Sequence, residues 1–334
     1  MTEVLATRPV PVSRVWSGSK IIAEDVQGED LGDVLNHSSD ASAWWVLPRD
    51  QNEAGPALRH AAQVLDIDDL AVRDLLAEDR RAKFESLGQS RIVVTNAVAL
   101  DRQRGELSAQ PVSMVVTDRA LICLVDLVPD GVNPARLLAS QARALADDGL
   151  ERALQIVLGA AIETYEAAVQ WLEDASDELE QALFEERALT KQEQLTAFRL
   201  RSVLSQLRRL TQPMRDVMDE AVEGSPPDPL ATRRWTILAE RHHRVANAAD
   251  ALRETLSSVF DTSLAMADLR MNVIMKQLTG WAAIIAVPTL VTGFAGMNVS
   301  FPLDGTSVGF WVYLALMLVA VVVLYVMFKA KSWI

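Results

Sequence analysis

Eight residues in the last quarter of the chain recur at intervals of three or four, so that they share one face of a helix. They are Asn272, Met275, Leu278, Ala282, Ala286, Thr289, Gly293 and Gly296. This face is polar or small at Asn272, Thr289, Gly293 and Gly296, and bulky and apolar at Met275 and Leu278. One helix cannot enclose a pore. Small and hydroxyl residues in a membrane helix indicate a polar pathway or close helix packing. If the chain forms a channel, several copies must therefore surround one axis with this face inside.

No catalytic constellation accompanies this stripe. The sequence has no HExxH, GxSxG, Walker or GxGxxG motif. His242 and His243 are adjacent and point about 100° apart on a helix, so they cannot chelate one metal ion, and a solvent-facing position is predicted for them. The single cysteine, Cys123, lies in an apolar run and is predicted to be a buried small hydrophobe. We expect no enzyme.

The composition limits the partners. The 334 residues include 45 acidic and 32 basic side chains, a formal net charge of −13, which argues against a general nucleic-acid binder. The most acidic stretch is 173–180, together with Glu185 and Glu186. A solvated helix face is the favoured interpretation. The alternative is an attractor for cations or for a basic ring near a membrane mouth.

Two uncharged stretches, 278–297 and 308–328, are each long enough to cross a hydrocarbon core, which needs about 20 helical residues. Lys276 precedes the first and Lys329 follows the second, whereas the connection 298–307 has no basic residue. The positive-inside rule therefore predicts two membrane helices with both termini in the cytoplasm and the short connection outside.

The rest of the chain divides into a mixed part and a helical part. Strands are predicted at 13–16, 21–24, 43–47, 91–100, 111–117 and 120–127, and helices at 53–65 and 68–76. Longer helices are predicted at 150–184 and 190–223, ended by the Gly- and Pro-rich break 224–229. The next helix, from 230, has no breaker before Gly280 and is expected to run into the first span. A helix of about 100 Å needs partners along its length, which implies oligomerisation.

These elements predict an α+β cytoplasmic domain with a mixed sheet, then a long stalk helix and two C-terminal membrane helices. The expected segments are 1–150 (cytoplasmic α/β domain), 151–229 (acidic helical hairpin), 230–277 (stalk), 278–297 (first span), 298–307 (outer loop), 308–328 (second span) and 329–334 (basic tail).

Gly296, Met297 and Asn298 stand at the outer end of the first span, after the stretches 272–279 and 288–291. A second span and a short basic tail follow. This arrangement resembles the CorA family of divalent-cation channels, whose hallmark is a Gly-Met-Asn motif at this location. The resemblance extends to the region around Asp74, to the acidic helix around 173–186 and to the break before the stalk.

The resemblance implies a funnel-shaped homopentamer in a cell membrane, with the first spans lining the pore. Gly296, Met297 and Asn298 would form the selectivity filter, where a ring of Asn298 amide oxygens contacts the water shell of Mg²⁺. Thr289 and Gly293 match further contacts along the pore, and Asn272 matches a polar ring at its inner end. Met275 and Leu278 match the hydrophobic gate.

The family also senses cytoplasmic Mg²⁺ between subunits. By motif position the ligands resemble Asp74 and Asp261, so Mg²⁺ is implied both as the transported ion and as the regulatory ion. Paired carboxylates repel each other until a divalent ion bridges them, and loss of that ion would let the subunits separate. The alternative is that both are ordinary surface acids.

Three functions remain open. The favoured one is uptake of Mg²⁺, with Co²⁺ or Ni²⁺ as further substrates. A second is Zn²⁺ transport, passive or proton-coupled, in the manner of the related ZntB branch; Met297 favours the magnesium branch. The third is a membrane-anchored scaffold that conducts nothing.

Overall fold

The computed structural model describes residues 12–26, 28–49, 51–77, 81–128, 131–184, 188–297 and 306–334. The chain divides into two compact units. The first comprises Met1–Glu180 and Lys191–Ser257, and the second comprises Gln181–Thr190 and Ser258–Ile334.

The first unit contains a seven-stranded sheet in the described part of the chain, in the order β2-β1-β3-β7-β6-β5-β4. Its strands are β1 Ser13–Ser17, β2 Lys20–Glu24, β3 Ala41–Pro48, β4 Lys83–Leu87, β5 Ser90–Asp101, β6 Glu106–Val116 and β7 Ala120–Val125. β3 and β7 pair in parallel, and the other neighbours are antiparallel. The predicted mixed sheet is confirmed, with β4 as a strand that was not predicted.

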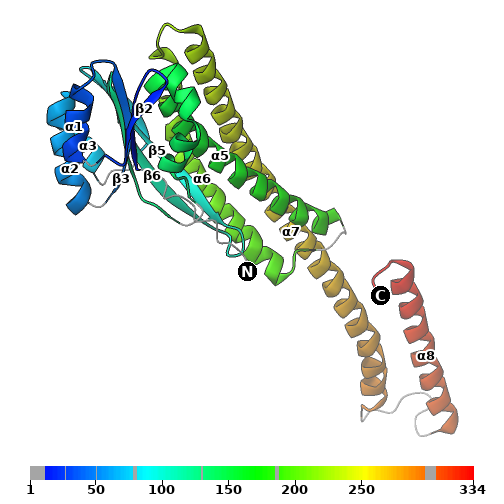
Figure 1. The fold of residues 1–334 in the computed structure, drawn as a ribbon. Coiled ribbons are helices and arrows are strands. Elements are labelled where there is room, and N and C mark those ends of the chain that lie inside the picture. The colour runs from blue at the N-terminus through cyan, green and yellow to red at the C-terminus, as the bar shows by residue number, and fades with distance from the viewer. Residues whose placement is uncertain are drawn as a thin grey trace, which may run out of the picture. The chain divides into compact units, whose positions relative to one another are not determined.

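Helices cover both faces of this sheet (Figure 1). On one face lie α1 Gly28–Asn36, α2 Gln51–Leu65 and α3 Asp69–Leu76. Their apolar sides share a buried core with β1, β3, β5, β6 and β7, to which Leu31, Leu58 and Leu75 contribute. β7 is buried along its whole length, as a central strand covered on both faces should be. Burial raises the pKa of the Cys123 thiol to about 12, so this residue is the inert hydrophobe that was predicted.

The other face is covered by the long helices. α4 Pro134–Ser140 leads into α5 Ala142–Phe184, which is interrupted at Gly149 by a left-handed φ of 70° and is regular from there on. Thr164 Oγ1 of α5 accepts a hydrogen bond from the Val98 amide of β5 at 3.0 Å, and the Tyr165 hydroxyl donates to the Asn96 carbonyl. α6 Lys191–Glu223 follows. Polar contacts therefore fix these helices against β5.

α7 Pro229–Ala295 is one helix of 67 residues that belongs to both units, and α8 Ser307–Ala330 follows it. The prediction that the stalk continues into the first apolar span is confirmed. The apolar stretches of both helices are long and uncharged enough to cross a membrane. Thr306 begins α8 as an N-cap, its Oγ1 accepting a hydrogen bond from the Gly309 amide at 3.1 Å.

Candidate pore helix and cation sites

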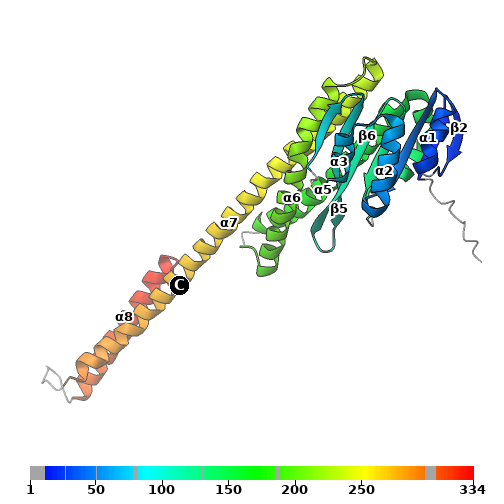
Figure 2. The ribbon, with the colours of Figure 1, turned by 90° about the vertical axis from the view of Figure 1, so that its left-hand side faces the viewer.

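In the second unit, α8 runs back alongside the C-terminal part of α7 (Figures 1 and 2). The buried positions on this part of α7 are Gly280 and Ile284, one helical turn apart. A Cβ atom on Gly280 would lie 3.1 Å from Ile334 and 3.8 Å from Phe328, so glycine lets the end of the chain pack closely there. Trp333 stacks on Phe328 with ring centroids 5.5 Å apart.

The predicted pore stripe occupies the opposite side of α7. Every residue of the stripe, Asn272 through Gly296, is exposed in the single chain. The side chains at the predicted gate are among the most open, with Met275 53% and Leu278 62% exposed, against 8% for Ile284. An added Cβ on Gly293 would meet nothing within 4 Å. Among the described residues, α8 thus leaves the stripe exposed, although Gly296 lines a cavity together with Gly309 and Phe310 of α8.

Two threonines on this helix donate their hydroxyl protons back to the backbone. Thr289 Oγ1 donates to the Ile285 carbonyl at 3.0 Å, and Thr292 Oγ1 donates to the Pro288 carbonyl at 2.9 Å. The lone pairs of Thr289 are then left to face the stripe as acceptors. A hydrated cation presents water hydrogens, so Thr289 is prepared to receive them.

α7 ends at the start of the predicted filter. The Gly296 amide donates to the Thr292 carbonyl at 2.9 Å, and a Cβ atom there would lie 3.1 Å from the same carbonyl oxygen. Glycine therefore fits this last turn more easily than a larger residue. Met297 is the last residue described before the connection, and the predicted ligand Asn298 lies outside the described residues.

Asp74, the first predicted sensor carboxylate, lies on α3 and already has a cationic partner. Lys83 Nζ of β4 lies 2.5 Å from Asp74 Oδ2 and 3.3 Å from Glu85 Oε2. Burial lowers the pKa of Lys83, but the hydrogen bond and charge of Asp74, with those of Glu85, outweigh it and raise that pKa. The pair lines a cavity of about 440 Å³, together with Asp216 and Glu220.

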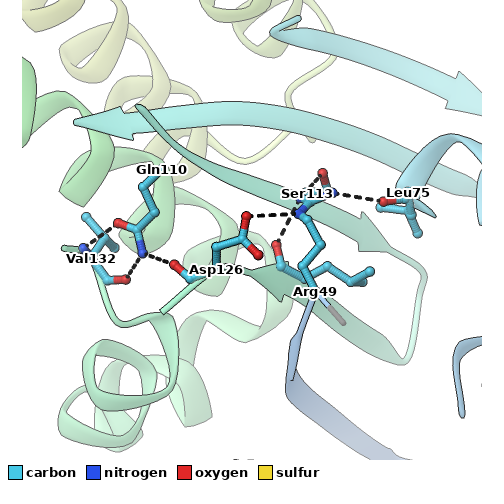
Figure 3. Close-up of polar contacts among 7 residues, drawn as sticks. Arg49, Leu75, Gln110, Ser113, Asp126 and Val132 are labelled. Carbon is cyan, nitrogen blue, oxygen red and sulfur yellow. Dashed lines mark hydrogen bonds and ion pairs between the residues drawn. The ribbon is translucent and has the colours of Figure 1, made fainter. Parts of the chain in front are cut away.

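A polar network anchors the end of α3 to the sheet (Figure 3). Arg49, which follows β3, donates to the Leu75 carbonyl at 3.3 Å and to Ser113 Oγ at 2.7 Å. The Gln110 side chain donates to the carbonyls of Asp126 and Val132 at 2.7 and 2.8 Å. These hydrogen bonds hold the segment after β7 in place. Arg49 therefore fixes the main chain at the residue that follows Asp74.

Asp261, the second predicted sensor residue, is exposed on α7 and belongs to the second unit, whereas Asp74 belongs to the first. Within the described residues, no three His, Cys, Asp or Glu side chains are grouped so that they could hold a metal ion. The pairing of Asp74 with Asp261 at a regulatory Mg²⁺ site stays a prediction.

The prediction that both histidines face solvent is wrong for His242. Its side chain is fully buried, edge-on to Tyr165 with ring centroids 6.2 Å apart, while His243 is half-exposed and lies 3.1 Å from Asp219. Burial, followed by the charges of His243 and Arg215, lowers the pKa of His242 to about 4; the Thr211 backbone and Asp219 oppose this only in part.

This burial predicts sensitivity to acid. The folded-state pKa lies below the unfolded value of 6.5, so the unfolded chain takes up a proton first. The contribution of neutral His242 to the free energy of unfolding is fully present above pH 6.5. It is lost as the pH falls towards 4, which lowers the free energy of unfolding by roughly 3 kcal/mol at 1.36 kcal/mol per pKa unit. In the full chain, hydrogen exchange of α6 and α7 amides, corrected for its intrinsic pH dependence, should report this loss.

His242→Leu should remove that pH dependence, whereas His60→Leu, at an exposed histidine on α2, should not. An equal loss of protection between pH 7 and pH 4.5 in wild type and His242→Leu would assign the acid sensitivity to other groups.

Several known proteins are similar to this chain in sequence and in fold. A family model described as CorA-like Mg²⁺ transporter protein matches residues 40–330. The cobalt/magnesium transport protein CorA of Thermotoga maritima is 24% identical over 308 residues, which are 91% of this chain and 87% of the relative. The complete structure of the CorA magnesium transporter from Methanocaldococcus jannaschii has a TM-score of 0.77 at 19% identity and covers 97% of this chain and 99% of that one.

A cytoplasmic domain of ZntB from Vibrio parahaemolyticus has the same fold at a lower level of similarity. Its TM-score is 0.52 at 14% identity, over 68% of this chain and 88% of that one. At these identities the likeness to either solved structure concerns the fold alone. The family model, by contrast, spans most of the sequence, and the chain therefore belongs to the family of CorA-like Mg²⁺ transporter proteins.

Proposed function

We propose that this protein is a homopentameric channel for uptake of divalent cations, with Mg²⁺ as the main ion and Co²⁺ and Ni²⁺ as further substrates. The family consists of transporters, so a role in divalent-cation transport follows from membership, and the protein is not an enzyme. The ion preference, the pore residues and the gating belong to the proposal.

One observation supports the proposal most directly. α8 packs on the side of α7 that holds Gly280 and Ile284, and the stripe on the other side is exposed to solvent in the single chain. Thr289 and Gly293 lie on this stripe within the predicted span. Small and hydroxyl residues in a membrane helix indicate close packing or a polar pathway, and we expect this face to line a water-filled axis. Several copies of α7 around that axis satisfy this requirement.

In the proposed mechanism the ion keeps its first water shell. Mg²⁺ loses water reluctantly, so neutral oxygens at Asn298 and Thr289 bind its waters instead of replacing them. Met275 and Leu278 form the apolar gate near the cytoplasmic end, and both termini lie in the cytoplasm. Cytoplasmic Mg²⁺, bound by Asp74 of one subunit and Asp261 of another, holds the gate closed.

The test is flux into proteoliposomes that contain the full chain, with Mg²⁺, Co²⁺ and Zn²⁺ offered separately, with and without a pH gradient. Mg²⁺ entry that needs no proton gradient and is suppressed by Mg²⁺ on the cytoplasmic face supports the channel. No flux of any ion above that of empty liposomes would contradict it and leave the scaffold hypothesis.

Zn²⁺ transport is the second candidate, because the cytoplasmic fold is similar to that of the ZntB domain. Zn²⁺ entry that increases with an imposed proton gradient would favour it over Mg²⁺ uptake. The predicted stripe contains no His or Cys, so a soft ion would find only oxygen ligands along it, which favours a hard ion.

The ion pair between Lys83 and Asp74 leads to a prediction about the proposed sensor. Lys83 acts as a tethered cation that competes with Mg²⁺ for the Asp74 carboxylate. Lys83→Gln frees that carboxylate and should lower the Mg²⁺ concentration needed for half-maximal protection from proteolysis. A partly buried ion pair contributes up to about 1 kcal/mol, which corresponds to a change of about fivefold in this Mg²⁺ concentration.

Lys20→Gln is the matched control, because Lys20 is exposed on β2, and it should leave the Mg²⁺ midpoint unchanged. A midpoint that stays the same or increases in Lys83→Gln would argue that Asp74 is not a Mg²⁺ ligand.

A further inference from the structure

A groove runs along α6 in the first unit, away from the predicted pore. It consists of two adjoining cavities of about 610 and 370 Å³, which share Ser205 and Arg208 as lining residues. Both volumes lie within the range of small-molecule sites. Its basic lining residues are Arg81, Arg201, Arg208, Arg209, Arg215 and Arg253.

The charge of this groove is opposite to that of the whole protein. Six arginines line it, against the two carboxylates of Asp216 and Glu254, in a chain of net charge −13. Like charges gathered in a concave surface repel one another, which is unfavourable unless an anion offsets them. Selection for solubility alone does not require such a cluster.

Arg81 has an interaction of its own, but the other five arginines leave much of their hydrogen-bonding capacity unused within the described part of the chain. Within the described part of the chain, no ion pair engages Arg201, Arg209 or Arg253. Arg215 donates one Nη2 bond to Asn247 at 2.6 Å, and its Nε is buried without a partner. Arg208 is paired with Asp250 at 2.7 Å and keeps its outer donors for a ligand.

The basic residues of the groove are all arginines, and none is a lysine. The planar guanidinium matches phosphate oxygens in a bidentate geometry, which a lysine ammonium cannot do. From Arg201 to Arg215 the helix rises about 21 Å, which is more than one phosphate group can span. Ser205 and Gln212 add neutral hydrogen-bond donors between the arginines. We propose that this arginine groove binds a polyphosphate anion, either inorganic or carried by a nucleotide.

The experiment measures binding of sodium tripolyphosphate and of ATP to the full chain in detergent, by calorimetry without divalent cations, with sulfate at equal ionic strength as the reference anion. Saturable binding of both with similar affinity assigns recognition to the phosphate chain, and binding of ATP alone assigns it to a nucleotide. Either result supports the groove as the site if the variants below agree.

Arg201→Ala combined with Arg209→Ala should weaken binding by about tenfold or more, because each removes a charge-assisted contact. Both side chains are exposed and carry no ion pair, so the fold should not change. Arg209→Lys keeps the positive charge but loses the planar guanidinium that can donate two parallel hydrogen bonds, and it should give an intermediate loss of affinity.

Arg102→Ala combined with Arg136→Ala is the matched control, since both are exposed arginines outside the groove. No saturable binding of either anion, or equal weakening in the control, would overturn the proposal. A second result would also overturn it: neither anion binds, and Arg201→Ala combined with Arg209→Ala changes the mass of the oligomer. In that case an acidic surface of a second copy of the chain would occupy the groove. None of these outcomes depends on ion transport, so the proposed function is tested separately.

Discussion

Replacement of Asn298 by Ala is expected to reduce Mg²⁺ flux into proteoliposomes by at least about 100-fold while the oligomer stays intact. The proposed ring of amide oxygens receives hydrogen bonds from the water shell of a doubly charged ion. A hydrogen bond to a charged partner contributes about 1.5–3 kcal/mol, and about 2.7 kcal/mol already corresponds to a factor of 100 in rate. Several subunits lose this contact together, so the loss should be severe.

Val319→Ala is the control for this prediction, because Val319 is an apolar residue of α8 that is 61% exposed. It should leave both flux and oligomer mass unchanged. Flux that persists in Asn298→Ala would remove Asn298 from the selectivity role, and loss of the oligomer in the same variant would assign it a role in assembly. A non-conducting scaffold would be indifferent to the substitution in every assay of its function.

The elements that the sequence predicts best are those whose signal is local. The two apolar helices follow from hydropathy and length, which act without reference to the rest of the fold. α6 ends and α7 begins where glycine and proline interrupt the chain, at Gly224 and Pro229. It could also be predicted that the stripe residues share one face, because α7 is continuous; that this face lines a pore stays a proposal.

The elements that were missed depend on tertiary contacts. β4 contains Lys83 and Glu85 among five residues and becomes a strand by antiparallel pairing with β5. α1 is a nine-residue helix that packs on α2 through Leu31 and Leu35. β4 has no strong period of its own, whereas α1 has Leu31, Val34 and Leu35 at helical spacing and was missed although its pattern is local. Missing β4 had a consequence for the site, because Lys83 is the cation that contacts Asp74.

The burial of His242, by contrast, could have been predicted from the sequence. Trp235, Leu238, Val245 and Ala249 are buried positions on α7, and together with His242 they form a series that steps by three and four residues. Polarity suggested solvent, but the period of the helix would have placed the ring in the core. The sensor pair differs from this case. Asp74 and Asp261 belong to separate units, and their proposed pairing across a subunit interface stays a prediction.

Replacement of Leu278 by Ser is expected to open the gate. An apolar ring in a narrow pore excludes water, so ions cannot pass when the pore is constricted, whereas a ring of hydroxyls keeps the constriction wet. A barrier lowered by about 1.4 kcal/mol increases the rate tenfold, so flux in the presence of saturating cytoplasmic Mg²⁺ should increase at least about tenfold. Leu278 is 62% exposed in the single chain, so the substitution removes little packing within it.

Leu269→Ser controls for the loss of an exposed leucine on the same helix. Leu269 is 67% exposed and lies off the stripe, nine residues before Leu278, and its replacement should leave suppression by Mg²⁺ intact. Met275→Ser, made separately, identifies which apolar ring controls flux, because only the narrowest ring can set the barrier. If both Leu278→Ser and Met275→Ser remain fully suppressed by Mg²⁺, the closed state does not depend on dewetting at this level, and the constriction must lie elsewhere along α7.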